Sequence, residues 1–355
     1  MINHCDQTRL ILQTVLDALE TETPLQIVGG ASKSFYGRTP QGKILDTHAH
    51  QGIVNYHPSE LVITARTGTP LSFIEQTLAE HGQMLAFEPP CFSPSTTLGG
   101  AIASGFSGAR RPFTGSVRDF VLGCKMINGK AEVLSFGGEV MKNVAGYDVS
   151  RLTVGAMGTL GVLLEVSLKV LPKPAVEKTR VFELTISDAL ALMTELSRKS
   201  LPLSGLSYVD NLMYVRLSGT EKSVISASKK IGGVELVDEN GFWQDCNEQH
   251  SHFFQASVDL WRISLPPATP VLSLSGEWVY EWGGAQRWLK TTEPRQNIFD
   301  LADEMQGHAC LFRARDRSAE LFQPMPEILK KLNRNIKAAF DPEGIFNPYR
   351  MLKEW

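Results

Sequence analysis

Apolar residues recur at helical spacing near the start of the chain, and short β-rich runs follow. The helical positions, which predict an amphipathic helix, are Leu10, Ile11, Val15 and Leu19. The runs at 24–28 and 61–66 each predict a strand. A helix is expected next, because Thr69 suits the N-cap, Pro70 the first helical position and Gly82 the end. These patterns predict a strand–helix unit ahead of residue 89.

The central segment 89–170 is dense in glycine but still contains apolar runs that can form strands. Thirteen of the chain's 30 glycines lie from Gly99 to Gly161. Glycine permits positive φ and lets another group approach the backbone closely. Several such positions between strands predict loops whose main-chain N–H groups surround an anion, typically a phosphate. The first hypothesis is therefore a nucleotide or dinucleotide site built from loops.

Asn128-Gly129 stands between two apolar runs, 116–127 and 130–136, and predicts a β-hairpin in which both turn residues adopt positive φ. This part of the sheet should be antiparallel or mixed. Beyond Pro172 glycine is sparser and strand and helix patterns alternate, which indicates a second α+β domain. Its predicted strands cover 180–185, 206–217, 258–265 and 278–282, and its predicted helices 189–198, 221–230 and 297–306. A last amphipathic helix is predicted over 326–340.

The composition is that of an ordinary soluble globular protein, with 43% hydrophobic and 21% charged residues. A net charge of −3 argues against a general nucleic-acid binder. The N-terminus lacks an apolar core after a basic start, so no secretory signal is predicted. The most apolar window, 152–171, carries Glu165, Lys169 and glycines, which favours a loop and buried strand over a membrane span.

The five cysteines are scattered and contain no CxxC pair. This pattern predicts neither a disulfide framework nor a zinc or iron–sulfur ligand set, and it favours a reducing, cytoplasmic location. Two His-x-His pairs occur, at His48 and His50 and at His250 and His252, and neither has the further ligands that a metal site needs. We therefore predict no metal site.

The first strand runs into the turn Gly29-Gly30-Ala31-Ser32-Lys33-Ser34. The glycine positions do not match the Rossmann fingerprint, and the chain contains no GxxxxGK[ST] phosphate loop. From these residues alone, a phosphate-binding loop and an ordinary turn are about equally supported.

Six motifs, taken in order, resemble the flavoproteins of the vanillyl-alcohol oxidase type, the PCMH-type FAD-binding family. They are GGASKS, TLGGAIASG, RDFVLG, KNVAGYD, GAMGTLGV and FDPEGIFNP. Within this family the chain is most similar to the FAD-binding subunits of bacterial glycolate oxidases, through NLMYVRL, LWRISLP, EWGGAQRWLK and GHACLFRAR. The resemblance implies an α+β, two-lobed FAD-binding domain (1–175), an inserted α+β cap (176–324), and a C-terminal helix and tail (325–355) that return to the FAD domain.

The same resemblance implies which residues bind FAD. The expected pyrophosphate loop is Gly29, Gly30, Ala31, Ser32, Lys33 and Ser34. A second set, expected along the pyrophosphate and the flavin, is Pro90, Thr97, Leu98, Gly99, Gly100, Ala103 and Ser104. The adenosine half is expected near Gly158, Thr159, Gly161 and Val162, and the flavin near Asn347. Family members with covalent FAD carry His where this chain has Ala31, so FAD should be non-covalent here.

The residues that would carry catalysis are less clear from the sequence. Oxidation of a 2-hydroxy acid needs a carboxylate anchor and a base, and Arg and His suit these roles. His308 and Arg313 are the candidates, with Arg315 on the same predicted strand. The plainer interpretation, a strand with solvated arginines, is favoured because His308 has no evident partner in the sequence.

The roles of several arginines, of the KNVAGYD residues and of three tryptophans stay open from the sequence. Arg110, Arg111 and Arg118 could contact phosphate, pair with a carboxylate or face a partner, and pairing of Arg118 with a carboxylate is the default. In KNVAGYD, packing and turn roles for Lys142, Tyr147 and Asp148 are at least as well supported as flavin contact. Three tryptophans are expected at an interface, namely Trp278, Trp282 and Trp288.

The function implied is that of an FAD-binding subunit of a glycolate (2-hydroxy acid) oxidase. Expected partners are a larger FAD-containing subunit, an iron–sulfur subunit that takes the electrons, and a small 2-hydroxy acid substrate. Nucleic acid is not expected, and contact with the inner face of the cytoplasmic membrane would come only through partners. Two alternatives stay open: a self-sufficient flavin oxidoreductase of another alcohol, sugar or hydroxy acid, and a non-catalytic structural subunit. Gly30→Val is predicted to abolish FAD retention with little loss of fold.

Overall fold

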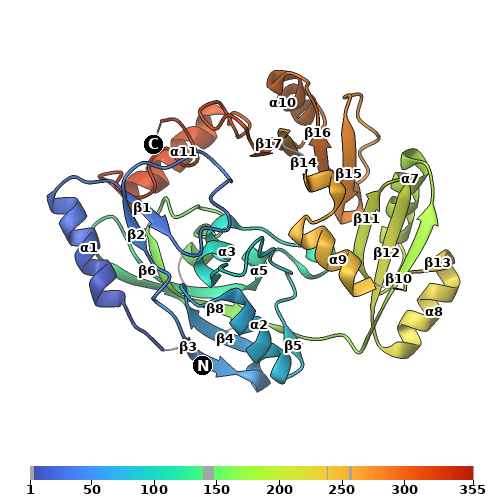
Figure 1. Ribbon diagram of the computed structural model, residues 1–355, viewed down its shortest axis with the longest axis horizontal. Helices are drawn as coiled ribbons and strands as arrows, with labels where there is room; N and C mark the ends of the chain where they lie inside the picture. The colour runs from blue at the N-terminus through green and yellow to red at the C-terminus, as the bar shows by residue number, and fades with distance from the viewer. Residues whose placement is uncertain (1–3, 139–147, 238, 256–257, 355) are drawn as a thin grey trace. The chain divides into compact units, whose positions relative to one another are not determined.

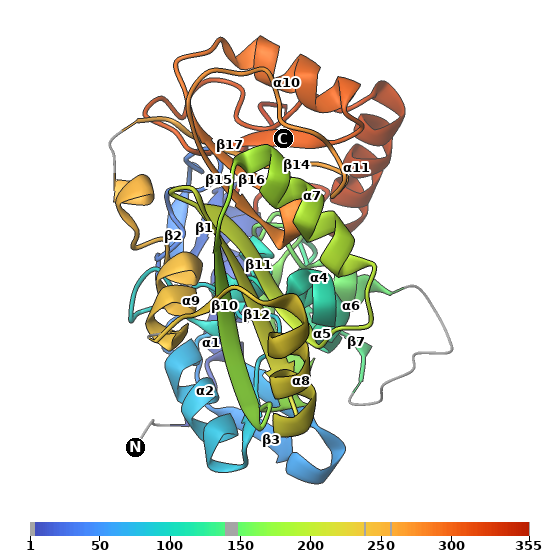
Figure 2. The same ribbon diagram turned by 90° about the vertical axis from the view of Figure 1, so that its right-hand side faces the viewer.

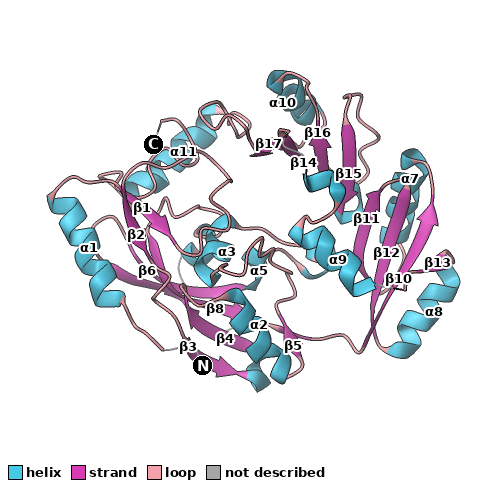
Figure 3. Ribbon diagram, viewed as in Figure 1, coloured by secondary structure: helices cyan, strands magenta, loops and turns pink. Residues whose placement is uncertain are grey.

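The chain forms two units, each built from helices and strands (Figures 1 and 3). The computed structural model describes residues 4–138, 148–237, 239–255 and 258–354. Unit 1 comprises Met1–Phe106, Ser116–Pro172 and Pro324–Trp355, and unit 2 comprises Ser107–Gly115 and Lys173–Gln323. The N-terminal and C-terminal segments of the chain therefore belong to the same unit.

Unit 1 is centred on a five-stranded antiparallel sheet in the order β3-β4-β8-β6-β7. Its strands are β3 (Ile53–His57), β4 (Val62–Arg66), β8 (Val162–Lys169), β6 (Val121–Ile127) and β7 (Val133–Gly137). Two shorter pairs accompany it: β1 (Leu25–Val28) runs parallel to β2 (Lys43–Asp46), and β5 (Gln83–Met84) pairs with β9 (Leu171–Pro172). Its helices are α1 (Thr8–Glu20), α2 (Leu71–Glu80), α3 (Leu98–Ser104), α5 (Val117–Phe120), α6 (Val149–Leu152) and α11 (Glu327–Phe340).

Two apolar clusters hold unit 1 together. One joins α2, α3 and the sheet through residues such as Leu71, Ile102 and Val166. The other joins α1, β1 and the C-terminal tail through Val15, Leu25 and Phe346, among others. The second cluster fixes β1, and with it the turn that follows β1, against segments from both ends of the chain.

Unit 2 is organised around an eight-stranded antiparallel sheet in the order β13-β10-β12-β11-β15-β16-β14-β17. The strands are β10 (Val176–Glu183), β11 (Leu203–Val209), β12 (Leu212–Gly219), β13 (Val234–Glu235), β14 (Leu260–Ser264), β15 (Glu277–Glu281), β16 (Gln286–Lys290) and β17 (His308–Arg313). Its helices are α4 (Arg111–Thr114), α7 (Ile186–Ser197), α8 (Glu221–Ile231), α9 (Glu239–Glu248) and α10 (Arg295–Glu304). In Figure 2, α7 and α8 lie along β10–β12, and α10 packs on the β14–β17 half through its own apolar cluster.

The predicted hairpin exists, but its turn differs from the expected one. The loop between β6 and β7 runs from Asn128 to Glu132, and the positive φ, 57°, belongs to Ala131. Oδ1 of Asn128 accepts hydrogen bonds from the main-chain nitrogens of Lys130 (3.0 Å) and Glu132 (2.9 Å). Gly129 is required for a tertiary reason, because a Cβ there would overlap the side chain of Asp341.

Other local predictions also need correction. Thr69 does not cap α2; its hydroxyl instead accepts a hydrogen bond from the nitrogen of Gly52 at 2.9 Å, and Pro70 occupies the N-cap. The single strand predicted over 206–217 is a hairpin, whose turn residues Asp210 and Asn211 have φ of 52° and 62°. Both residue types tolerate positive φ, so a continuous apolar pattern concealed a tight turn.

The amphipathic pattern was also misleading on two helices. In α1, Ile11 and Val15 are buried, but Leu10 is exposed. In α11 the apolar positions Ile328, Leu329 and Leu332 are 71%, 45% and 52% exposed, whereas Lys337 is buried. Besides the contact of Phe340 with Phe136, α11 is therefore held to the rest of unit 1 by a polar contact of Lys337, which is described below.

Candidate cofactor-binding site

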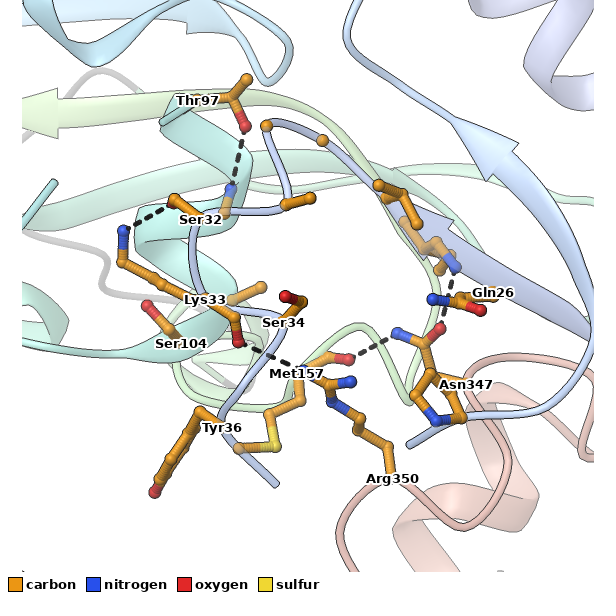
Figure 4. Close-up of a pocket in the computed structure, with 18 residues that line it drawn as sticks. Gln26, Ser32, Lys33, Ser34, Tyr36, Thr97, Ser104, Met157, Asn347 and Arg350 are labelled. Carbon is orange, nitrogen blue, oxygen red and sulfur yellow. Dashed lines mark hydrogen bonds between the residues drawn. The ribbon is translucent and has the colours of Figure 1, made fainter. Parts of the chain in front are cut away.

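A pocket in unit 1 forms where the turn after β1 meets α3 and the C-terminal tail (Figure 4). Its cavity volume is about 150 Å³. The lining residues are Gln26, Ile27, Val28, Gly29, Gly30, Ala31, Ser32, Lys33, Ser34, Tyr36, Pro40, Thr97, Gly100, Ala103, Ser104, Met157, Asn347 and Arg350. All of residues 29–34 line it, so the turn predicted to hold a phosphate is the main wall of the pocket.

The main chain of this turn is available to a ligand. Within the described residues, the N–H groups of Gly29, Gly30, Ala31 and Ser32 donate to no protein acceptor. Buried or half-buried main-chain donors are normally paired, and adjacent unpaired N–H groups form an anion-binding concavity. Ala31 has a φ of 54°, so the turn contains a left-handed residue of the kind that such concavities use.

Two cationic side chains also line the pocket, Lys33 and Arg350. Nζ of Lys33 donates to Cys91 O at 3.2 Å and to Ser32 Oγ at 3.3 Å. Nη2 of Arg350 donates to Lys33 O at 3.4 Å, which holds the C-terminal tail against the turn. Two fixed positive charges beside unpaired N–H groups make this pocket suited to a diphosphate.

Asn347 joins the tail to both sides of the pocket, as Figure 4 shows. Its Oδ1 accepts from Ile27 N at 2.8 Å, and its Nδ2 donates to Met157 O at 2.6 Å. The tail main chain continues this pairing: Leu25 N donates to Ile345 O, and Asn347 N donates to Leu25 O. Asn347 is buried, so these hydrogen bonds position β1 relative to the loop around Met157.

A buried ion pair fixes the turn between α11 and this tail. Nζ of Lys337 donates to Asp341 Oδ2 at 2.5 Å, to Thr159 O at 2.7 Å and to Phe346 O at 3.1 Å. Asp341 also accepts from the main-chain nitrogens of Ile345 and Phe346. Burial lowers the pKa of Lys337, while Asp341 acts in the opposite direction. The pair satisfies the main-chain groups of the turn that delivers Asn347 and Arg350.

The glycines around the pocket have different tasks. A Cβ on Gly30 would overlap the main-chain oxygen of Ser95, so Gly30 is needed for packing of two protein segments. The expectation that Gly30→Val would leave the fold nearly intact is therefore wrong: the valine side chain would meet the backbone of Ser95 first, and the fold of the turn would be disturbed. At Gly100, which lines the pocket in α3, a Cβ would meet only Thr97 Oγ1, at 3.5 Å. Gly100 is thus the position where an added side chain would enter open space.

The structure brings together part of the predicted cofactor-binding set. The pocket is lined by residues 29–34 together with Thr97, Gly100, Ala103, Ser104 and Asn347. The other predicted residues do not line this pocket, and they are Pro90, Leu98, Gly99, Gly158, Thr159, Gly161 and Val162. Several of these have evident packing roles: Leu98 and Val162 belong to the apolar clusters, and a Cβ at Gly158 would stand 2.7 Å from Asn347 Nδ2.

Sequence reasoning missed seven lining residues, namely Gln26, Ile27, Val28, Tyr36, Pro40, Met157 and Arg350. Arg350 offered a weak signal, because it lies two positions after the motif FDPEGIFNP. Met157 lies in the motif GAMGTLGV but was not predicted to line the pocket; its positive φ of 51° turns its carbonyl to Asn347.

The two catalytic candidates lie at opposite ends of β17 in unit 2 and do not form one site. His308 begins the strand and Arg313 ends it, five residues and roughly 16 Å apart at about 3.3 Å per residue, with a β-bulge between them. Arg313 stacks over Phe312 at 5.5 Å, and burial lowers its pKa to about 10. Arg315 lies beyond the strand and pairs with Asp259 at 3.5 Å. His308 is instead close to Arg262 and Arg111, whose charges, after burial, lower its pKa.

The structure also places the arginines, the tryptophans and Asp148 for which the sequence left several interpretations open. Arg118 donates to the main-chain oxygen of Arg151 at 3.3 Å, whereas Arg110 pairs with the carboxylate of Glu177. Trp282 and Trp288 are each only 4% exposed, so they are core residues and the interface expectation for them is wrong. Asp148 caps α6. Lys142 and Tyr147 lie outside the described residues.

The pairing of Arg110 with Glu177 yields a stability prediction. Arg110 is buried, and its charge and the Ser218 hydroxyl outweigh burial and lower the pKa of Glu177 below 4.5. Glu177→Gln should destabilise unit 2 by about 2 kcal/mol at pH 7, because Arg110 loses its counter-charge. The effect should fade as the pH falls below 4.5 through the folded-state pKa, since the wild-type carboxylate is then protonated.

Urea unfolding followed by tryptophan fluorescence measures this effect, because Trp243, Trp261, Trp278, Trp282 and Trp288 all lie in unit 2. The control is Glu235→Gln, which removes a half-exposed partner of Lys178 and Arg180 and should cost less than about 0.5 kcal/mol. Equal losses for the two variants would contradict the prediction.

The described residues contain no group of three or more His, Cys, Asp or Glu side chains arranged to hold a metal ion. His50 is buried, with Nδ1 accepting from Gln7 N and Nε2 paired with Leu164 O, both at 3.0 Å. All five cysteines are free thiols. In the same described residues, no helix combines the length and the apolar character needed to cross a membrane.

Comparisons with known proteins show which family and which fold the chain resembles. A family model described as an FAD binding domain matches residues 4–137. Glycolate oxidase subunit GlcE of Escherichia coli (strain K12) is 47% identical over 354 residues, which cover 100% of both chains. D-lactate dehydrogenase of Archaeoglobus fulgidus is 26% identical over 227 residues, which cover 63% of this chain and 48% of that protein.

Solved structures resemble the chain in fold. p-Cresol methylhydroxylase with substrate bound matches with a TM-score of 0.76 at 15% identity, covering 99% of this chain and 88% of the other. Alkyldihydroxyacetonephosphate synthase matches with a TM-score of 0.66 at 14% identity, covering 95% and 74%. The expected α+β, PCMH-type fold is thereby confirmed, and so is the FAD-binding domain that contains most of the pocket wall.

Proposed function

This chain belongs to the family of the glycolate oxidase subunit GlcE, and on that premise we propose that it is the FAD-binding subunit of a glycolate oxidase complex. In this role it takes part in the oxidation of glycolate to glyoxylate and passes electrons to partner subunits. The observation that carries the proposal is 47% identity along the full length of both chains. A pocket suited to a diphosphate within the matched FAD binding domain supports it.

The pocket residues fit non-covalent FAD. The N–H groups of residues 29–32, with Lys33 and Arg350, would hold the two phosphates. Gly100 leaves open the space that a Cβ would fill. FAD supplies the acceptor for the hydride that leaves a 2-hydroxy acid. Ala31 stands where covalent attachment would require a nucleophilic side chain, which supports reversible binding.

In this proposal unit 1 is the FAD-binding domain, with the C-terminal helix and tail, and unit 2 is the cap. The partners are a larger FAD-containing subunit and an iron–sulfur subunit, and any membrane contact is made through them. The name of the relative, a subunit of glycolate oxidase, supports an assembly of several chains. Five free cysteines support a reducing, cytoplasmic setting.

The visible absorption spectrum of the freshly purified chain tests the proposal. We expect flavin bands that are lost on acid precipitation of the protein, as non-covalent FAD requires, and co-purification of partner chains from the source cell. Colourless protein that binds no added FAD but retains its partners would favour the structural subunit. Reduction of the bound flavin by a different alcohol or sugar, in the pure chain and without partners, would favour the self-sufficient oxidoreductase.

A further inference from the structure

A second segment of unit 1, the backing segment (residues 91–97), lies against the turn 29–34. Ser95 Oγ donates to Gly30 O at 2.6 Å, and a Cβ on Gly30 would overlap Ser95 O, so the two main chains are in direct contact. Within the backing segment, all of which the structure describes, Thr97 alone lines the pocket. The backing segment therefore shapes the turn mainly from outside the pocket.

Thr96, in the backing segment, is buried behind the turn. Its main chain is fixed, because its nitrogen donates to Ser93 O at 3.1 Å and its oxygen accepts from Leu71 N at 2.9 Å. Its Oγ1 lies 2.7 Å from Ser32 Oγ and also contacts Cys91 O. A side chain outside the pocket wall is thus joined to a hydroxyl that lines the pocket.

The hydroxyl of Thr96 has one proton and two possible acceptors. A hydroxyl donates one hydrogen bond and accepts up to two, so Thr96 donates either to Cys91 O or to Ser32 Oγ. Cys91 O has a second donor, since Lys33 Nζ lies 3.2 Å from it. The proton of Thr96 can therefore go to Ser32 without leaving Cys91 O unsatisfied.

The direction of this hydrogen bond decides what Ser32 offers to a ligand. When Thr96 donates to it, Ser32 Oγ accepts from Thr96 at 2.7 Å and from Lys33 Nζ at 3.3 Å (Figure 4). Both lone pairs of Ser32 are then occupied, and its own proton is left to be donated. When Thr96 donates to Cys91 instead, the Ser32 proton goes to Thr96, and Ser32 has only a lone pair left for the pocket. A phosphate oxygen accepts hydrogen bonds, so the first arrangement is the one that suits a diphosphate.

We propose that Thr96 is a positioning residue for a bound diphosphate. By donating to Ser32 Oγ, it commits the Ser32 hydroxyl to donate to a phosphate oxygen, beside the main-chain N–H groups of residues 29–32. The inference rests on the proposed function for the identity of the ligand, FAD. It predicts that the effect of Thr96 on affinity requires Ser32.

Calorimetric titration of the flavin-free full-length chain with FAD, and separately with inorganic pyrophosphate, tests this role. Thr96→Val keeps the shape of the side chain but removes its proton, and it should weaken binding by about five- to tenfold. Thr96→Ser restores the hydroxyl and should bind within about twofold of wild type. Ser32→Ala should lose at least as much affinity as Thr96→Val. Adding Thr96→Val to Ser32→Ala should weaken binding no further, because the two side chains act as one unit.

Thr64→Val is the matched control. Thr64 and Ser167 are buried in the sheet of unit 1, their hydroxyl oxygens lie 2.8 Å apart, and neither residue lines the pocket. This variant loses the same kind of hydrogen bond, so its thermal unfolding temperature should fall about as much as that of Thr96→Val. Its affinity for FAD and for pyrophosphate should nevertheless equal that of wild type.

Three results would overturn the inference: Thr96→Val binding the probes as tightly as wild type does, a further loss when Thr96→Val is added to Ser32→Ala, or an equal loss of affinity in Thr64→Val. A wild-type chain that binds pyrophosphate with the expected dependence on Thr96 and Ser32 but does not bind FAD would refute the proposed flavin function alone. FAD binding that is insensitive to Thr96→Val would refute this inference alone. A chain that binds neither probe would refute both.

Discussion

Replacing Gly100 by leucine is expected to remove FAD from the protein while unit 1 stays folded. The Cβ of residue 100 would have only Thr97 Oγ1 near it, at 3.5 Å, and Gly100 lines the pocket. The rest of the leucine side chain would therefore occupy space that the cofactor needs. An overpacked contact costs about 1–3 kcal/mol, which is roughly a 5- to 150-fold loss of FAD affinity. The ratio of flavin to protein absorbance after gel filtration measures the loss.

Gly100→Ala provides the matched control at the same position. Its methyl group makes one ordinary contact, and alanine favours the helical conformation of α3 by about 0.5–1 kcal/mol over glycine. We expect Gly100→Ala to retain FAD and the wild-type circular dichroism spectrum. If Gly100→Leu retained full FAD occupancy, the pocket would not be the FAD site. If it lost its circular dichroism signal, the loss of FAD would reflect misfolding.

Lys337→Met should cause the largest loss of stability among single substitutions in unit 1. Methionine is similar in length to lysine, but it would leave Asp341 buried without its counter-charge and would leave Thr159 O without its donor. Breaking a buried pair in this way costs about 3–5 kcal/mol. The turn that carries Asn347 and Arg350 would loosen, so FAD should also bind more weakly. Thermal release of FAD, followed by flavin fluorescence, should occur several degrees lower than in wild type.

Lys330→Met on the same helix separates the buried pair from a general effect of lost charge. Lys330 pairs with Glu327 at 2.9 Å, and the Glu327 side chain is exposed. Surface pairs of this kind contribute about 0–1 kcal/mol, so FAD release should be nearly unchanged. An equal effect of the two variants would mean that Lys337 does not fix the C-terminal tail.

The candidate cofactor site was predictable in outline because its sequence signals are local. The turn 29–34 follows a strand and combines glycines with small hydroxyl residues, and all six residues line the pocket. The motif around Asn347 was also recognisable in the sequence, and Asn347 lies in the pocket wall. These local sequence signals did not show which residues contact a ligand and which are needed only for packing. Gly30 and Gly100 look alike in sequence, yet one faces the backbone of Ser95 and the other faces open space.

The prediction of catalytic residues was less successful, again because a local signal did not show which residues lie close together in the structure. His308 and Arg313 lie near each other in sequence, but an extended strand separates its two ends by roughly 16 Å. The groups near His308, Arg111 and Arg262, come from a short helix and another strand, separated from it by about 200 and about 50 residues. No spacing rule connects positions whose proximity depends on sheet register.

The sequence by itself determined the family, the α+β class, the turn and tail that line the candidate pocket, and the place where glycine-rich loops end and a second sheet begins. It could do so because the order of motifs, the hydrophobic periodicity and the residue types that favour turns are all properties of residues close together in the sequence. Only the tertiary structure decided that Lys337 is buried beside Asp341, that Arg350 reaches the pocket, and that Arg111 and Arg262 share one tryptophan. Each of these depends on distant segments meeting in three dimensions, and their free energies come from burial and charge that no local pattern records.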